Sequence, residues 1–475
     1  MTIDLKDTDI KKTEKVENTP KVVQKPKIKK KLKLWKILLF LILFILLGLG
    51  AYYGVKLYKI SNKFGFKLDT NTIFTVKEPE LKKDASGNFT NVLLVGIDTR
   101  ENSDLLNTDS IILLSYNYNT KEAVMISIPR DFHVEIDEKT KIYRRINYVY
   151  SYSESQKAGS GLQSLANSVA EVTGMEVQYY AMIDYTGFTE IIDIVGGIEV
   201  NVENSFTDYM YPKGFGYKTV SFKAGPQIMD GAKALEYSRS RHSSQNQEGT
   251  DYARARRQQK VIATLQEKIL SNETLANPKK LMEILSSLSD NIKVSEFTQD
   301  DVKAAITLGK EFSETGKKAY SFVLDPYSGN FKLIQVKSME SGAFAIGPVL
   351  GFGKYDDIKE YVNNIIEKPA LYSERATVYI YNTGLTTKEV TTKVKEMQKE
   401  YPYINIVQSY IKLGTHEGVT VFPTDTTKYL ATTEEFASYF KTENKTKPES
   451  ITQRITTDGV IVLLGEEVQL SETEE

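Results

Sequence analysis

Five arginines crowd the stretch SRSRHSSQNQEGTDYARARRQQK between residues 238 and 260, with a single aspartate among them. A guanidinium group stays charged at physiological pH, and its planar fork donates paired hydrogen bonds to phosphoryl oxygens. The cluster therefore predicts a site for phosphate or another anion. Its arginines are Arg239, Arg241, Arg254, Arg256 and Arg257, and the aspartate is Asp251.

The spacing predicts that part of the cluster shares one helix face. On a helix that begins near residue 250, Asp251, Arg254 and Gln258 stand at positions i, i+3 and i+7. Arg257 stands beside this face, whereas Arg256 points away from it. One carboxylate, one amide and two guanidinium groups would thus face the same ligand.

Two other arginines of the cluster and one arginine outside it extend the candidate site. Arg239 and Arg241 are two residues apart, so they point to the same side in extended backbone, and Arg130 follows a predicted strand in SIPRD. The alternative interpretation is that these arginines lie on a solvent-exposed face and form surface salt bridges. Only Glu236 and Glu248 join the aspartate nearby, which is too few to neutralise the cluster. This balance favours an anion site.

Two aspartates lie at the ends of successive predicted strands. Asp98 ends the first strand, in GIDTR, and Asp109 precedes the second, in NTDSIIL. If the strands are neighbours, both carboxylates reach the sheet edge at which open α/β folds bind ligands. Mg²⁺ binds through one or two carboxylates, waters and phosphate oxygens. Aspartate is also common in turns and helix caps. Asp98 and Asp109 could therefore be either a pair of metal ligands or two turn residues, and the sequence does not decide between these interpretations.

Composition excludes several classes of chemistry. The 475 residues include no cysteine and three histidines without ligand-like spacing, which argues against thiolate nucleophiles, disulfides and Cys/His zinc sites. No G-x-S-x-G elbow, phosphate-binding P-loop or H-E-x-x-H motif occurs. Lys and Arg number 61 against 62 acidic residues, so the chain has no overall attraction to nucleic acid.

The N-terminal sequence predicts an uncleaved membrane anchor. Residues 37–55 are 19 uncharged positions, close to the ~20 that a membrane-spanning helix needs. Eight lysines between residues 21 and 36 place the preceding tail in the cytosol, so the rest of the chain is expected outside the cell. A cleaved signal peptide is the alternative, but its apolar core would be shorter.

Strand and helix patterns alternate after the anchor. Apolar runs at 91–97, 110–116 and 123–129 have strand length, and helical periodicity follows at 161–174. The alternation predicts an α/β sandwich. We expect a disordered basic tail at 1–36, the anchor at 37–55, a stalk at 56–87, a main domain at 88–368 and a small α/β accessory domain at 375–466.

The order of the motifs resembles the LytR-CpsA-Psr family of wall-polymer phosphotransferases. Over roughly residues 88–368 the chain carries NVLLVGIDTR, NTDSIILLSYN, VMISIPRDFHVEI, RRINYVYSY, DYTGFTEIIDIVGGIEVNV, ALEYSRSRH and DYARARRQQ. The segment from ATVYIYNTG to DGVIVLLGEE is similar to an accessory domain that many members carry. The resemblance implies a mixed central sheet packed by helices. It also implies Mg²⁺-dependent transfer of a glycopolymer, such as capsule or teichoic acid, from a polyprenyl-pyrophosphate carrier to peptidoglycan outside the cell membrane.

The resemblance assigns roles to individual residues. Asp98 and Asp109 match the family's metal-side aspartates. By the same match, catalytic roles are expected for Arg130, Arg239, Arg241, Asp251 and Arg254, and substrate binding for Arg100, Arg145, Arg257 and Gln258.

Three positions depart from the family pattern. Asn107 stands where arginine is usual, which removes one positive charge and is expected to weaken phosphate binding. Arg145 replaces a usual lysine and keeps the charge. Ala253 replaces a usual glycine on a helix, which is a minor change.

Two other functions stay open on the sequence alone. A non-catalytic polyprenyl-phosphate sensor or a transcription attenuator would use the same anion site, although arginines outside the cell cannot contact DNA. Alternatively, the accessory domain could be the active part, as a wall-binding module.

Overall fold

The chain is described from a computed structural model. The predicted anchor at 37–55, Asp98 and Arg100 lie outside the described residues. None of the described helices is both long and apolar enough to cross a membrane. The structure describes residues 79–466 apart from 98–106, 138–139, 215, 276, 278, 281–282, 285, 288–291, 296–297, 318, 326–331, 339–343, 412 and 453–454.

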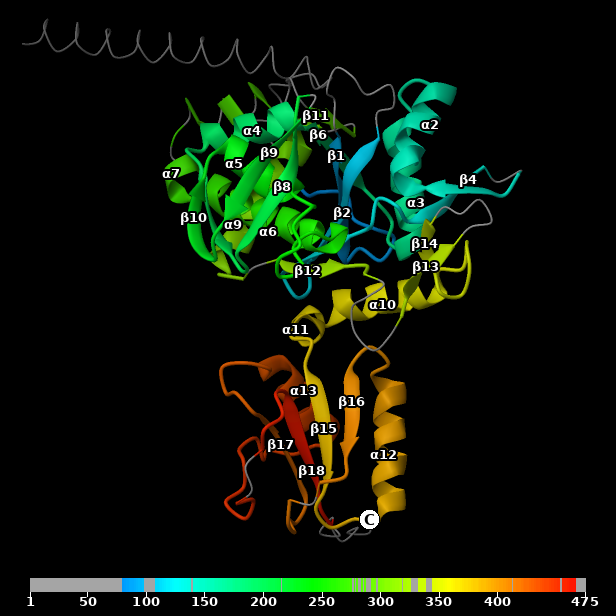
Figure 1. The fold of residues 1–475 in the computed structure, drawn as a ribbon, viewed down its shortest axis with the longest axis vertical. Coiled ribbons are helices and arrows are strands. Elements are labelled where there is room, and N and C mark those ends of the chain that lie inside the picture. Colours follow the sequence, from blue (N-terminus) through cyan, green and yellow to red (C-terminus); the bar gives the residue numbers. More distant parts are fainter. Residues whose placement is uncertain are drawn as a thin grey trace, which may run out of the picture. The chain divides into compact units, whose positions relative to one another are not determined.

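A six-stranded sheet organises the main part of the chain (Figure 1). Its strand order is β11-β6-β1-β2-β3-β12. Pairing is parallel between β1 and β6 and between β3 and β12, and antiparallel elsewhere. The expected mixed α/β architecture is confirmed. The strands are β1 (Phe89–Ile97), β2 (Thr108–Asn117), β3 (Glu122–Ser127), β6 (Tyr179–Asp184), β11 (Ile292–Val294) and β12 (Tyr320–Val323).

Side-chain alternation along β1 gives the sheet two different faces. Leu93, Val95 and Ile97 are at most 2% exposed and belong to the large hydrophobic core. Leu94 and Gly96 alternate with them and are only partly buried. Because successive strand residues point to opposite faces, one face of the sheet is sealed and the other borders an apolar cavity.

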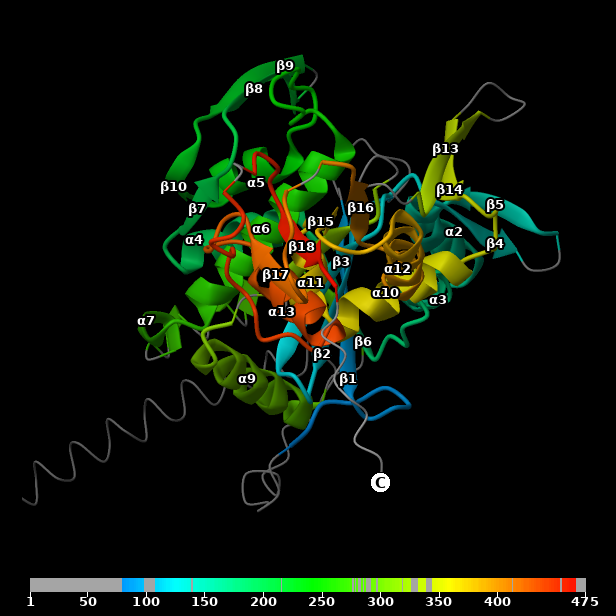
Figure 2. The same ribbon diagram turned by 90° about the horizontal axis from the view of Figure 1, so that it is seen from below.

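Helices cover both faces of the sheet (Figures 1 and 2). On the sealed face, α3 (Gly161–Thr173) packs Leu165 and Val169 into the core. On the other face, α4 (Tyr185–Ile194), α5 (Gly231–Arg239) and α6 (Asp251–Ile269) frame the cavity. Further helices are η2 (Ile146–Tyr148), α2 (Val149–Gln156), α7 (Asn272–Leu275), α9 (Gln299–Glu314), α10 (Asp356–Glu367) and α11 (Pro369–Ser373).

Polar caps set the starts of the helices that frame the cavity. Asp184, Asp230 and Thr250 each precede one of them in extended backbone and accept a hydrogen bond from the third residue onward. Such a cap contributes about 1 kcal/mol to helix stability. Since β6 ends at the capping Asp184, Tyr185 stands at the edge of the sheet.

Pairs of short strands surround the central sheet. A register irregularity in β8 lies between Asp208 and Tyr211, and Asp208 is completely buried. Irregularities of this kind re-aim side chains. The pairs are β4 (His133–Asp137) with β5 (Ile142–Arg145), β7 (Ile198–Val202) with β10 (Gly225–Met229), β8 (Phe206–Lys213) with β9 (Gly216–Phe222), and β13 (Ile334–Ser338) with β14 (Phe344–Pro348).

The C-terminal residues form a separate four-stranded sheet with the order β16-β15-β18-β17. β15 and β16 are parallel and flank α12, so this segment is a βαβ unit as its sequence pattern predicts. The boundary between main and accessory domains stays a prediction. The elements are β15 (Thr377–Asn382), α12 (Thr387–Glu400), β16 (Asn405–Ser409), β17 (Val419–Pro423), α13 (Leu430–Tyr439) and β18 (Val460–Leu464).

Candidate active site

Three side chains converge on Asp109 near the start of β2. Nη1 of Arg130 donates to one carboxylate oxygen at 2.8 Å, and the Tyr185 hydroxyl donates to the other at 3.2 Å. Nη2 of Arg254 lies 3.5 Å from the main-chain oxygen of Asp109. Residues from the ends of two strands and from two helices therefore meet at one edge of the sheet.

Asp251 couples the same two arginines from α6. Its carboxylate lies 2.9 Å from Nη1 of Arg254, which is three residues further along the helix. It also lies 3.8 Å from Nε of Arg130. The two guanidinium groups are thus held between two aspartates, and their orientation is fixed.

The charges of this cluster perturb one another. Burial lowers the pKa of Arg254; Asp251 opposes this effect, whereas Arg130 and Arg241 add to it. Burial acts to raise the pKa of Asp109, but the neighbouring Arg130 and Arg254 outweigh it, so this pKa is lowered. Asp109 is therefore ionised at neutral pH.

Two hydrogen-bond donors of the cluster are buried without an acceptor. These are the Nε atoms of Arg130 and Arg254, for which the described residues supply no hydrogen-bond partner. An unsatisfied buried donor costs roughly 1–3 kcal/mol, and native proteins retain few of them. The carboxylates of Asp131 and Asp251 lie 3.7 and 3.8 Å from Nε of Arg130, too far for a hydrogen bond, so both Nε atoms can still donate to another acceptor such as an anion.

Arg239 ends α5 and stands between two tyrosine rings. Its guanidinium carbon is 4.1 Å from the centre of the Tyr185 ring and 5.6 Å from that of Tyr211. Nη1 lies 3.4 Å from the Tyr211 hydroxyl. Stacking on aromatic faces fixes the plane of a guanidinium group, so Arg239 presents an oriented fork at the cavity.

Hydrogen bonds to the buried Asp208 hold the segment that carries Arg241. One carboxylate oxygen of Asp208 accepts hydrogen bonds from the Ser240 hydroxyl at 2.6 Å, the Arg241 amide at 3.0 Å and the His242 amide at 3.2 Å. The guanidinium group of Arg241 has no hydrogen bond or ion pair with a described residue. Its charge acts on Arg254, which places Arg241 at the same site.

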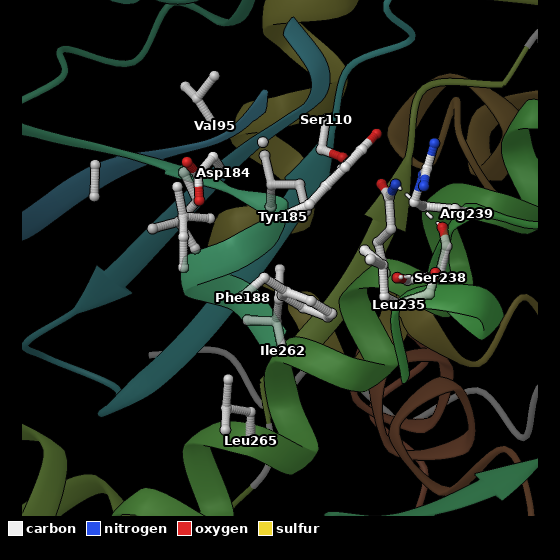
Figure 3. A pocket seen from close by; sticks show the side chains of 16 residues that line it. Val95, Ser110, Asp184, Tyr185, Phe188, Leu235, Ser238, Arg239, Ile262 and Leu265 are labelled. Carbon is white, nitrogen blue, oxygen red and sulfur yellow. Dashed lines mark hydrogen bonds between the residues drawn. The ribbon is translucent and has the colours of Figure 1, made fainter. Parts of the chain in front are cut away.

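An apolar cavity of about 220 Å³ opens beside these arginines (Figure 3). Figure 3 shows Arg239 and Ser238 at one side and Leu265 at the opposite side. Ser110 and Gln258 line this cavity and also a small polar cavity around Asp109. The other apolar wall residues include Leu94, Ile112, Ile183, Phe188, Leu235 and Ile262.

A comparison with models of known protein families supports the family resemblance that the order of the motifs indicated. Residues 52–330, more than half of the chain, match the profile of the LytR_cpsA_psr family. The chain belongs to the LytR-CpsA-Psr family.

Members of the LytR-CpsA-Psr family with similar sequences include proteins named as transferases and proteins named as regulators. The chain is 30% identical over 236 residues to the polyisoprenyl-teichoic acid–peptidoglycan teichoic acid transferase TagU of Enterococcus faecalis, covering 48% of this chain and 70% of that protein. It is 30% identical over 196 residues to the regulatory protein MsrR of Staphylococcus aureus, covering 41% of this chain and 53% of that protein. The crystal structure of Bacillus subtilis TagV matches 59% of this chain and 98% of its own, with 21% identity and a TM-score of 0.45.

The structure brings together most of the residues that the sequence predicted for this LytR-CpsA-Psr protein. Arg145 lies at the margin, where it is half exposed and forms a 3.2 Å ion pair with Asp131. Asp131 in turn lies 3.7 Å from Arg130. The residues that lie together are Asp109, Arg130, Arg239, Arg241, Asp251, Arg254 and Gln258.

Arg257, predicted to bind substrate, is buried and lines neither of the two cavities at the arginine cluster. It is 4% exposed and donates to the main-chain oxygens of Tyr237 and Glu248, both at 2.9 Å. It also bonds to the Glu248 carboxylate and to the main-chain oxygen of Ser240. Because its donors are already used inside the protein, we exclude Arg257 from the substrate site.

The sequence analysis did not identify three residues that belong to the site. Tyr185 binds Asp109 and stacks on Arg239, and Tyr211 contacts the same arginine. The position of Tyr185, directly after a strand that ends at the sheet edge, is a signal that could have identified it. Asp208 gave no such signal, because it reaches Ser240 through the tertiary fold alone.

The described residues offer limited support for a metal site. They contain no group of three or more His, Cys, Asp or Glu side chains able to hold a metal ion. A Mg²⁺ ion that binds mainly to pyrophosphate and water needs only one or two carboxylates. Asp109 supplies one such carboxylate at the arginine cluster, and its oxygens already accept hydrogen bonds from Arg130 and Tyr185. Its predicted partner Asp98 lies outside the described residues.

Replacement of Asp208 by asparagine is expected to destabilise the protein in a pH-dependent way. Burial acts to raise the pKa of Asp208, but hydrogen bonds from Ser240 and three backbone amides outweigh it and lower this pKa below 3.8. Its stabilising contribution is therefore complete above the unfolded pKa and is lost as the pH falls through the lower folded value. Urea unfolding of wild type and Asp208→Asn should show a constant difference above about pH 5 and a shrinking difference below about pH 4. A difference that stays unchanged at low pH would contradict this role.

Proposed function

We propose that the protein is an extracellular, membrane-anchored phosphotransferase that moves a glycopolymer from a polyprenyl-pyrophosphate carrier to peptidoglycan. Family membership and the name of the transferase relative support this activity. The predicted anchor at residues 37–55 supports a location on the outer face of the membrane.

The observation that carries the proposal is the junction between the arginine cluster and the apolar cavity. Gln258 and Ser110 border both cavities, and Arg239 lines the apolar one. A polyprenyl pyrophosphate has a charged head joined to an apolar tail, which matches these two neighbouring environments. The cavity of about 220 Å³ is smaller than the roughly 300–1,000 Å³ of drug-sized sites, so it suits the first isoprenoid units of the tail.

The proposed reaction is an attack by a peptidoglycan hydroxyl on the phosphorus that carries the sugar. A new P–O bond forms, the bond to the bridging oxygen breaks, and polyprenyl phosphate leaves with its electron pair. The hydroxyl proton passes to a base. Arg130, Arg239, Arg241 and Arg254 bind the pyrophosphate and stabilise the charge that develops on its oxygens, while Asp109 and Asp251 orient Arg130 and Arg254.

Mg²⁺ is part of the proposal, with Asp109 and Asp98 as its protein ligands. Bound there, the ion would supply additional positive charge for the phosphoryl oxygens. The arginine network of the chain supplies the remaining charge and the orientation.

The proposed function is tested with the purified full-length chain in detergent micelles. A polyprenyl-pyrophosphate-linked oligosaccharide and peptidoglycan fragments are supplied with Mg²⁺, and polyprenyl phosphate and glycan-bearing peptidoglycan are measured. We expect both products in equal amounts, and neither after chelation of the metal. Tight binding of the lipid without turnover would instead favour a lipid-binding regulatory protein, an alternative suggested by the name of the MsrR relative.

Filling the apolar cavity is expected to weaken binding of the lipid carrier. Ile262 lines the cavity from α6, and Ile262→Trp would place a large ring in it. Each buried methylene contributes about 0.8 kcal/mol, so excluding a few of them raises KM about tenfold or more. The rise should be much smaller for a substrate with a short tail. Ile262→Leu conserves volume and serves as the control, and equal KM values for both variants would refute the assignment.

A further inference from the structure

A second cleft lies on the part of the protein formed by α2, α3 and the β4–β5 hairpin, which Figures 1 and 2 show close together. Its volume is about 370 Å³, within the roughly 300–1,000 Å³ typical of small-molecule sites. Unlike the apolar cavity, it is lined largely by hydroxyl, amide and carboxylate groups. The polar residues that matter here are Glu135, Ser153, Ser164, Asn167, Ser168 and Glu171.

Helix α3 presents a polar stripe to this cleft. Ser164, Asn167, Ser168 and Glu171 stand at positions i, i+3, i+4 and i+7, which lie on one helix face. The sealed side of the same helix carries apolar residues such as Leu165. Asn167 and Glu171 are exposed, as expected for the outer face of an amphipathic helix, whereas Ser164 is half-buried and Ser168 is buried.

Ser168 is the residue of the stripe that points most directly to a ligand. It is 8% exposed, lines the cleft and makes no side-chain hydrogen bond with any described residue. Because this hydroxyl faces the cleft and has no protein partner, it is available to a ligand there. Beside it lie the hydroxyl of Ser164 and the amide of Asn167, whose oxygen accepts a hydrogen bond from Gln163 at 2.9 Å.

The charge of the cleft restricts the ligand. Glu135 pairs with Lys141 at 2.9 Å and accepts from the Tyr143 hydroxyl at 3.1 Å, and Asp137 and Glu171 add two more carboxylates. Three acids against one base disfavour a polyanion. No group of three carboxylates in the described part of the chain is arranged to hold a metal ion. The cleft thus fits an uncharged ligand rich in hydroxyl and amide groups.

We infer that this cleft binds the N-acetylated sugars of a peptidoglycan glycan strand, as a subsite for the acceptor of the transfer reaction. The inference rests on the proposed function for the identity of the acceptor. Sugar hydroxyls and acetamido groups both donate and accept hydrogen bonds, which suits the mixture of serine, asparagine and glutamate side chains. Ile136 and Val149 supply the apolar contact that the carbon faces of sugar rings require.

The β4–β5 hairpin connects the cleft with the arginine cluster. Glu135 and Asp137 on β4 line the cleft, whereas Arg130 and Asp131 directly precede this region of the chain. β4 has five residues, about 17 Å at ~3.3 Å per residue. This length is an upper limit for the chain between the two sites, so a strand of several sugars in the cleft could also reach the pyrophosphate site.

The test measures binding of a β-1,4-linked N-acetylglucosamine tetrasaccharide to the full-length chain in detergent micelles by calorimetry. Loss of one hydrogen-bonding group costs about three- to tenfold in affinity. We expect this loss for Asn167→Ala and for Ser168→Ala. Gln156→Ala is the matched control, because Gln156 is an exposed amide at the end of α2 that does not line the cleft. It should bind like the wild type.

Two further measurements make the result decisive. A glycerol-phosphate oligomer of similar length should bind at least about tenfold more weakly than the tetrasaccharide, because the cleft is acidic. Equal binding of this polyanion, unchanged affinity in both cleft variants, or no tetrasaccharide binding by the wild type would each overturn the inference. Cleavage of the lipid-linked donor, measured on the same wild-type sample, reports separately on the proposed function.

Discussion

An Arg241→Ala variant is expected to fold like the wild type and to lose about 10²- to 10³-fold in kcat for glycopolymer transfer. The guanidinium group has no hydrogen bond or ion pair with a described residue, so its removal breaks no such bond within the described part of the chain. Its charge nevertheless acts on Arg254 at the centre of the site. Transfer rates with a lipid-linked donor test the first expectation, and thermal unfolding tests the second.

Arg256→Ala is the matched control for this experiment. Arg256 belongs to the same arginine cluster in the sequence, but its side chain is exposed and lines neither cavity. Removal of the same charge at this position should leave kcat within about twofold of the wild type, since surface substitutions away from the site have small effects. Equal losses in the two variants would show that only the overall charge of the cluster matters.

The strands of the main sheet could be predicted because burial dictates their composition. The apolar runs expected at 91–97, 110–116 and 123–129 became β1, β2 and β3, with boundaries shifted by one or two residues. The pairing of β1 with β6 could not be predicted in this way. It depends on which of several apolar segments lie side by side, and local patterns do not encode that choice.

Helical spacing predicted part of the candidate site well. Asp251 and Arg254 form the expected pair along α6, and Gln258 lies further along the same face. The same reasoning placed Arg257 beside them, yet this side chain enters the protein interior. Spacing defines a direction around the helix axis, but the neighbouring elements decide whether that direction leads to solvent or to buried partners such as Glu248.

The residues that hold the arginines in place could not be predicted from sequence patterns. Asp208 and Tyr211 come from β8, far along the chain from the sheet edge, and act on Ser240 and Arg239 only after the hairpin has packed. The apolar cavity was likewise not predictable, because it too depends on how distant segments pack. Leu94 and Ile262 are typical core residues by type, and only the spacing between helices and sheet leaves a space beside them.

An Arg257→Met variant is expected to lose about 3–5 kcal/mol of unfolding free energy, because it leaves the buried Glu248 carboxylate without its charged partner. Arg257 is 4% exposed and ties together the main chain at Tyr237, Ser240 and Glu248. It also lies 4.8 Å from the centre of the Phe206 ring. Urea unfolding followed by far-ultraviolet circular dichroism measures the loss.

A double variant separates the buried charge from lost packing. In Glu248→Gln/Arg257→Met no uncompensated charge remains, and the amide can still bond to Asn204, which lies 3.1 Å from the Glu248 carboxylate. We therefore expect a smaller loss of stability than in Arg257→Met alone. If the two variants unfold at the same urea concentration, the ion pair is not what stabilises this region. If Arg257→Met is as stable as the wild type but inactive, Arg257 contacts the substrate after all.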